Sequence, residues 1–161
     1  MTMIQKMQAK KSKKGFTLVE LVIVIAILAI LAAIAIPVIT TTINSSKMSV
    51  LESDTATVNM LVKEAVNNRA ANISTTKYAG TEATSDDLTV HMVLAANDID
   101  DADDFYARSI GGTTYTMGYT TTGDGALSIG VDVDDATDIS GDTKIKDLAQ
   151  AAGLEAGGAA E

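Results

Sequence analysis

The stretch KKGFTLVELVIVIAILAILAAIAIP, residues 13–37, decides how this chain folds. Its apolar run is uninterrupted from Leu21 to Ile36. A helix over residues 16–39 would be about 36 Å long, which is enough to cross the hydrocarbon core of a bilayer. One carboxylate, Glu20, lies near the start of this helix, where a charge is costly in lipid. The stretch therefore predicts a membrane-length helix with one acid that needs a partner.

Charge is distributed unevenly on the two sides of this stretch. Residues 1–15 contain five lysines and no acid, so that 7 of the 12 basic residues and all 21 acidic residues follow from Phe16 onward. The lysines predict a cytoplasmic N-terminus and an exported C-terminal part. A surface this acidic repels nucleic acid and anionic lipid, and no direct nucleic-acid site is predicted. The absence of cysteine excludes disulfides and thiolate metal sites.

Three interpretations of the apolar run compete. The first is a single-pass membrane anchor. The second is a cleaved secretory signal, with Ala33-Ile34-Ala35 as its small-residue site, although Pro37 close behind argues against cleavage there. The third accounts for the whole stretch, because it explains why three features follow one another in this order: a basic leader, Gly-Phe-Thr-Leu-Val-Glu at residues 15–20, and the apolar run.

This order resembles the type IV pilin family and the related pseudopilins of secretion and competence systems. The matching residues are Lys14, Gly15, Phe16, Thr17, Leu18, Val19, Glu20, the run to Ile36, and Pro37. The resemblance implies a prepilin that a membrane aspartic peptidase cuts between Gly15 and Phe16 on the cytoplasmic side. The same enzyme would then methylate the new N-terminus at Phe16. The apolar helix would stay in the mature protein, first as an anchor and later in a filament core.

The resemblance also implies assembly roles. Family precedent pairs the glutamate, here Glu20, with the N-terminal amine of a neighbouring subunit, which offsets the cost of burying a carboxylate. An interfacial acid favoured by the helix dipole is the alternative. Leu18, Val19 and the apolar run would carry polymerisation. Pro37 should kink or locally open the helix because it lacks a backbone donor, and relatives with glycine in place of Ala29 can melt between these positions.

The amphipathic pattern predicts that the same helix continues past the apolar run. Leu51, Val58, Val62 and Ala65 form an apolar stripe that needs a partner sheet. The predicted organisation is a cleaved basic leader (1–15), a transmembrane and filament-core helix (16–39), its amphipathic continuation (40–71) and an extracellular globular part with an antiparallel sheet (72–161). The fold class is therefore α+β, with a long N-terminal helix packed on a small antiparallel sheet as in type IV pilins.

The C-terminal part predicts short elements. Residues 72–85 are polar and typical of a loop. Residues 85–96 fit a strand or a short helix begun by residues 85–87, with Leu88 and Met92 on one side, and we favour the helix. The remaining predicted elements are three strands of an antiparallel meander, 105–110, 113–121 and 126–133, and a last helix, 144–152.

Two acidic clusters are candidate calcium sites, although neither fits an EF-hand loop. The first lies within residues 98–104. The second is the better candidate and consists of Asp132, Asp134, Asp135, Asp138 and Asp142. Solvated loops that keep the protein soluble are the competing interpretation. We therefore predict no cofactor, with calcium at the second cluster as the alternative.

An enzyme is not predicted. His91 is the only histidine, and the chain contains no G-x-S-x-G, Walker or dinucleotide fingerprint, so His91 is expected at a loop or surface position. The predicted function is a structural pilin. The alternatives are a pseudopilin of a type II secretion or competence system and a non-polymerising, membrane-anchored exported binding domain.

The resemblance implies a set of partners and two locations. The partners would be identical or related pilin subunits, the prepilin peptidase, and the platform protein and ATPase of pilus assembly. The subunit would lie in the cytoplasmic membrane before assembly and in a cell-surface pilus afterwards.

Overall fold

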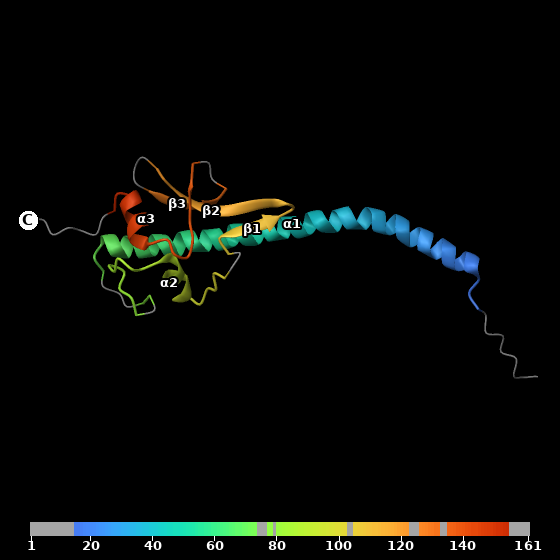
Figure 1. The fold of residues 1–161 in the computed structure, drawn as a ribbon, viewed down its shortest axis with the longest axis horizontal. Coiled ribbons are helices and arrows are strands. Elements are labelled where there is room, and N and C mark those ends of the chain that lie inside the picture. The colour runs from blue at the N-terminus through green and yellow to red at the C-terminus, as the bar shows by residue number, and fades with distance from the viewer. Residues whose placement is uncertain are drawn as a thin grey trace, which may run out of the picture. The chain divides into compact units, whose positions relative to one another are not determined.

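A computed structural model of the chain describes residues 15–73, 77–78, 80–102, 105–122, 126–132 and 135–154. By their internal contacts the residues form two compact units, Met1–Thr42 and Ile43–Glu161. Helix α1 contributes to both (Figure 1). The elements are α1 (Leu18–Ala70), α2 (Val90–Ala95), β1 (Ala107–Ile110), β2 (Thr113–Thr121), β3 (Leu127–Val131), β4 (Thr137–Asp138) and α3 (Ile145–Ala151). The predicted α+β class is confirmed.

In the first unit α1 has no packing partner among the described residues. Every residue from 15 to 42 is exposed. From Leu18 to Ile36 all side chains are apolar except that of Glu20 in the first turn. A helix that is apolar on all sides is stable only when something covers it. By length and composition α1 is long and apolar enough to cross a membrane.

Helix α1 is continuous through Pro37. Local opening at Pro37 is therefore not observed in the single subunit, and the kink expected as its alternative stays a prediction. Proline removes one backbone donor, but the hydrogen bonds of the neighbouring turns remain. The hydroxyls of Thr40 and Thr41 donate to the carbonyls of Pro37 and Val38, each at 2.9 Å, so both side chains bond back to the helix backbone just after the proline.

In the second unit α1 buries one face, as its apolar stripe predicts. Leu51, Val58, Val62 and Ala65 are fully buried. Thr55 lies on the same face, where its hydroxyl donates to the carbonyl of Leu51 at 2.7 Å, so this buried polar group is paired. The stripe was read correctly because its spacing of three and four residues matches one side of an α-helix.

The sheet is the antiparallel meander β1-β2-β3, with the short strand β4 also paired to β2. On one edge of β2, the paired segment changes at Met117 from the β1 side to the β4 side. The N–H of Met117 donates to the carbonyl of Tyr106 at 2.8 Å, and its carbonyl accepts the N–H of Ile139 at 3.0 Å. β4 was missed by the sequence analysis. It is two residues long within a polar segment, and it pairs because Gly118 leaves room: a Cβ there would lie 2.7 Å from the Cβ of Ala136.

The sheet and α2 lie on opposite sides of this part of α1 in the view of Figure 1. One hydrophobic core joins them. Its fully buried members from outside α1 include Tyr78, Leu88, Val93, Leu94, Met117, Ile145 and Leu148. The side-chain oxygen of Asn59 on α1 also accepts the N–H of Ile129 in β3 at 3.2 Å, which fixes the sheet against the helix.

The segment 85–96 forms a helix rather than a strand, as favoured, but the helix begins later than predicted. Its N-cap is Thr89, whose hydroxyl accepts the N–H of Met92 at 3.4 Å. Val90, Val93 and Leu94 face the core, whereas Met92 is only half-buried. The expected start at residues 85–87 is wrong because those residues make other contacts.

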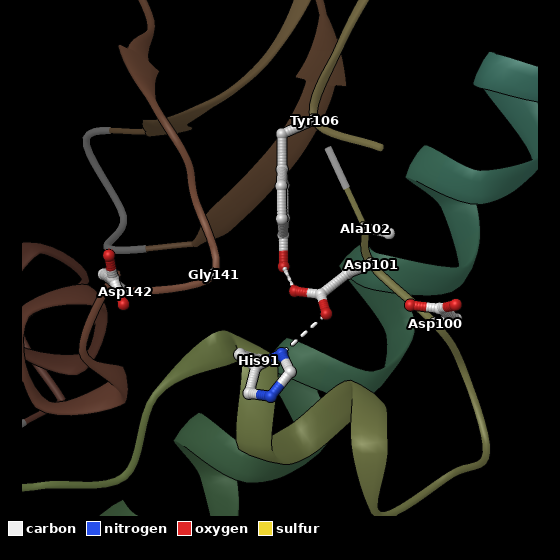
Figure 2. Close-up of a pocket in the computed structure, with 7 residues that line it drawn as sticks. All are labelled: His91, Asp100, Asp101, Ala102, Tyr106, Gly141 and Asp142. Carbon is white, nitrogen blue, oxygen red and sulfur yellow. Dashed lines mark hydrogen bonds and ion pairs between the residues drawn. The ribbon is translucent and has the colours of Figure 1, made fainter. Parts of the chain in front are cut away.

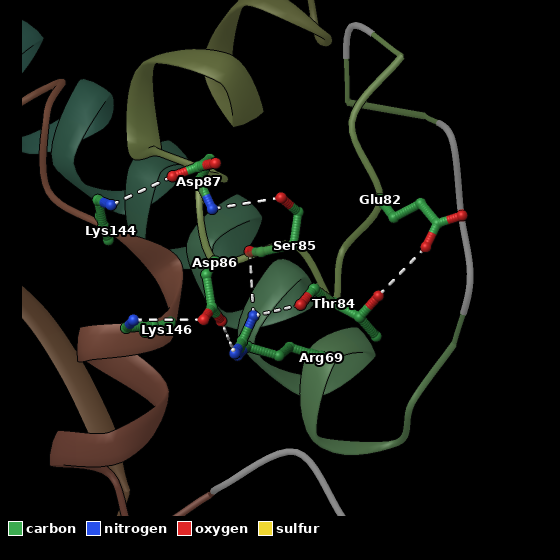
Figure 3. A network of polar contacts seen from close by, with 8 residues as sticks. All are labelled: Arg69, Glu82, Thr84, Ser85, Asp86, Asp87, Lys144 and Lys146. Carbon is green, nitrogen blue, oxygen red and sulfur yellow. Dashed lines mark hydrogen bonds and ion pairs between the residues drawn. The ribbon is translucent and has the colours of Figure 1, made fainter.

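Those contacts form a polar network around Arg69, near the end of α1 (Figure 3). Its Nη1 donates to the carbonyls of Thr84 (2.7 Å) and Ser85 (3.0 Å), and its Nη2 pairs with Asp86 at 2.6 Å. Lys146 of α3 also reaches Asp86, at 3.4 Å. The hydrogen bond from Arg69, followed by that from Lys146, lowers the pKa of Asp86. In a chain without cysteine, this network ties the 84–87 loop to α1 and α3.

Candidate processing and assembly site

The candidate processing site is the chain just before α1. A Cβ added to Gly15 would meet no described atom within 4 Å, and its backbone lies outside the left-handed region. The fold of the described residues therefore does not itself require glycine at this position. Phe16 is 86% exposed, which is unusual for a phenylalanine. In the described part of the chain, nothing covers either residue.

Thr17 and Glu20 form a reciprocal capping box at the start of α1. The hydroxyl of Thr17 accepts the backbone N–H of Glu20 at 3.2 Å. In return, one carboxylate oxygen of Glu20, Oε2, accepts both the backbone N–H of Thr17 at 3.0 Å and its hydroxyl at 2.9 Å. The box satisfies donors that a helix N-terminus otherwise leaves unpaired.

Leu18 and Val19 lie between these two residues and are both exposed.

Residues 10–36 match the family described as the prokaryotic N-terminal methylation motif. The chain carries a prokaryotic N-terminal methylation motif. This motif is the class III signal peptide of type IV pilins, and with the apolar helix it supports a pilin-like or pseudopilin prepilin that is anchored in a membrane before assembly. Such proteins are structural and are not an enzyme family.

Comparisons with curated proteins and with solved structures gave no significant match. The methylation motif covers residues 10–36 and ends before Pro37. The globular part of the second unit lies outside it.

The candidate calcium ligands that the structure describes do not form one cluster. In the described part of the chain, no group of three or more His, Asp or Glu side chains is placed to hold a metal ion. Asp132 and Asp135 occupy left-handed turn positions, with φ of 51° and 60°. Asp134 lies outside the described residues. Asp142 instead lines a separate pocket, together with residues from the first acidic cluster.

That pocket, of about 450 Å³, surrounds His91 and Asp101 (Figure 2). The Asp101 side chain is only 6% exposed, and its two oxygens accept hydrogen bonds from different elements. Nδ1 of His91 on α2 donates to Oδ1 at 2.6 Å, and the hydroxyl of Tyr106 donates to Oδ2. A Cβ on Gly141 would lie 3.0 Å from Oδ2, so glycine lets the 140–143 turn close over the carboxylate.

Electrostatics in this pocket follow from the buried carboxylate. Burial raises the pKa of Asp101, but the hydrogen bonds from Tyr106 and His91 outweigh burial, and the pKa is lowered overall. Burial and the neighbouring carboxylate both raise the pKa of Tyr106. His91 is 61% exposed on α2, the surface position that was expected. The arrangement fastens α2 to the segment before β1.

Sequence reasoning missed the capping box and the Asp101 contacts for different reasons. The capping box has a readable signature, Thr17-Leu-Val-Glu20 directly before an apolar run. Its role as a helix cap was overlooked because the same residues also belong to the methylation motif. The Asp101 contacts have no local signature, because they join residues 5 and 10 positions apart across a turn.

Proposed function

We propose that this chain is the structural subunit of a type IV pilus. It is made as a prepilin, cut between Gly15 and Phe16, and methylated at Phe16. The cleaved leader is residues 1–15. The open surroundings of Gly15 and Phe16 support this proposal, because a peptidase needs access to both.

The observation that carries the proposal is the exposed apolar surface of α1, most of which lies within the methylation motif. Apolar surface of this extent does not remain in water. In the membrane, lipid covers residues 16–39. After extraction by the assembly ATPase and platform protein, equivalent helices of other subunits cover the same surface, so Leu18, Val19 and the rest of the run carry polymerisation.

Glu20 supplies the register of the filament. Cleavage converts the Phe16 amide nitrogen into a free α-amine, which is a cation at neutral pH. Pairing of Glu20 with the Phe16 amine of a neighbour joins two different surfaces of the subunit. Contacts of this head-to-tail kind generate open helical filaments rather than closed dimers.

The remaining segments have supporting roles. Residues 40–71 connect the filament core to the globular part, and residues 72–161 form the outer surface of the pilus. Adhesion, motility or aggregation would depend on that outer surface. A pseudopilin shares the processing and anchoring chemistry and differs in filament length.

Purification of surface filaments from a host with pilus machinery tests the proposal. We expect filaments of micrometre length that contain this chain with an N-terminus at methylated Phe16 by intact-mass analysis. Methylated chain in short, membrane-attached assemblies would make it a pseudopilin. Unprocessed chain would make it a plain anchor, and a chain cut after Ala35 would make the apolar run a signal peptide.

Substitution of Glu20 tests the register role separately. Glu20→Ala should leave cleavage and methylation intact and abolish filaments. Glu52→Ala is the matched control, because this exposed acid lies on α1 outside the apolar run. Normal filaments from the Glu20 variant would overturn the pairing role.

A further inference from the structure

The capping box leaves Glu20 with one occupied and one available carboxylate oxygen. Both donors of Thr17, the backbone N–H and the hydroxyl, bond to Oε2. Among the described residues, nothing donates to Oε1. A carboxylate has acceptor capacity for about four hydrogen bonds, so the free oxygen can take a further donor without loss of the first two.

From this division we propose that Thr17 is a positioning residue for assembly. It holds Glu20 by Oε2, so that Oε1 is presented to the amine of an incoming subunit. This inference rests on the proposed function, because it concerns the partner of the same carboxylate. The new element is that one carboxylate binds two partners at once, Thr17 of the same subunit through Oε2 and the amine of the neighbouring subunit through Oε1.

Positioning matters because a free glutamate side chain samples many rotamers. Fixing such a side chain during association costs free energy. In this subunit the hydroxyl and the N–H of Thr17 have already fixed it. The same two hydrogen bonds reduce the penalty for bringing the carboxylate into lipid or into a filament core, since a buried charge needs its hydrogen bonds satisfied.

The hydroxyl of Thr17 can be tested apart from helix capping. Thr17→Val keeps the shape and removes the hydroxyl. Thr17→Ser keeps the hydroxyl. Thr17→Gly also removes the hydroxyl, but glycine is nearly as good as threonine at an N-cap, so the helix start is retained.

The assay uses the full chain in a host with prepilin peptidase and assembly machinery. Filament yield is measured per mature, methylated subunit in the membrane, so that a variant cut more slowly still reports on assembly. Thr17→Ala replaces the valine variant if valine blocks cleavage completely. We expect about tenfold less filament from the valine and glycine variants, because both lack the hydroxyl that bonds to the charged carboxylate of Glu20. The serine variant, which keeps this hydroxyl, should change by no more than about twofold.

Each outcome decides one question. Wild-type yield from the valine variant would overturn the positioning role, and so would a serine variant as defective as valine. A defective valine variant beside a normal glycine variant would reduce Thr17 to a helix cap. Processed wild-type chain that never forms filaments would instead refute the proposed function, which separates the two failures.

Discussion

Removal of the Arg69 guanidinium should destabilise the globular part of the second unit substantially. We consider Arg69→Met, which keeps most of the apolar stem. It removes two hydrogen bonds to the carbonyls of Thr84 and Ser85, at 2.7 and 3.0 Å, and the pair with Asp86. The side chain of Arg69 is 11% exposed, so water replaces these bonds poorly.

The magnitude follows from the two carbonyl bonds. A hydrogen bond to a charged group contributes about 1.5–3 kcal/mol. The two bonds share one donor nitrogen and are not additive, so we expect a loss of about 3 kcal/mol. Asp86 is exposed, and its pair with Arg69 adds little. For a unit of this size the loss corresponds to a decrease in Tm of about 10 °C.

The measurement is thermal unfolding of the full chain in detergent micelles, followed by near-ultraviolet circular dichroism. The four tyrosines all lie in the second unit and report on its packing, without the signal of the apolar helix. Lys146→Met is the matched control, because it removes only an exposed contact to Asp86 and should lower Tm by no more than about 2 °C. Equal Tm values for the two variants would refute the assigned role of the carbonyl bonds.

Three further predictions concern other parts of the chain. Gly118→Ala should cost about 1–3 kcal/mol and release β4, because its Cβ would lie 2.7 Å from that of Ala136; hydrogen exchange at β4 should rise, and unchanged protection would contradict the close contact. The pKa of Asp101 is lowered in the folded state, so its contribution to stability is present above its unfolded pKa and is lost as pH falls through the folded pKa. Asp101→Asn should therefore lower Tm at pH 7. It should also reduce the loss of Tm as pH falls below the unfolded Asp pKa of about 3.9, and an unchanged loss of Tm in acid would count against the role of the carboxylate. Ala29→Gly should increase hydrogen exchange between residue 29 and Pro37 in filaments, since glycine weakens a helix by about 1 kcal/mol, whereas equal exchange would show that alanine does not limit opening there.

The parts of the fold that sequence predicted well are those with a local period. The stripe Leu51, Val58, Val62 and Ala65 follows helical spacing, and all four residues are buried. The three meander strands alternate and are separated by turn residues, so their positions were readable to within about two residues. Local patterns of this kind depend on one segment at a time, which is why they survive in the folded chain.

The parts that sequence could not predict depend on distant partners. Arg69 lies on the helical stripe, yet its bonds to residues 84–86 required knowledge of how the loop returns. Ser85 and Asp86 resemble a helix start, but bonds to Arg69 and Lys146 hold the loop and the cap falls at Thr89. In the candidate site, the methylation motif could be recognised from the sequence. That both donors of Thr17 bond to the same oxygen of Glu20 depends on atomic positions, which a sequence does not give.

The contact between Asn59 and Ile129 has a consequence for crowded subunits. β3 pairs with β2 on one side only among the described strands, so its other side offers unpaired backbone groups of the kind that recruit strands from foreign chains. The amide of Asn59 occupies the N–H of Ile129 on that side. We expect this hydrogen bond to discourage strand pairing between the sheets of subunits that are crowded in a membrane.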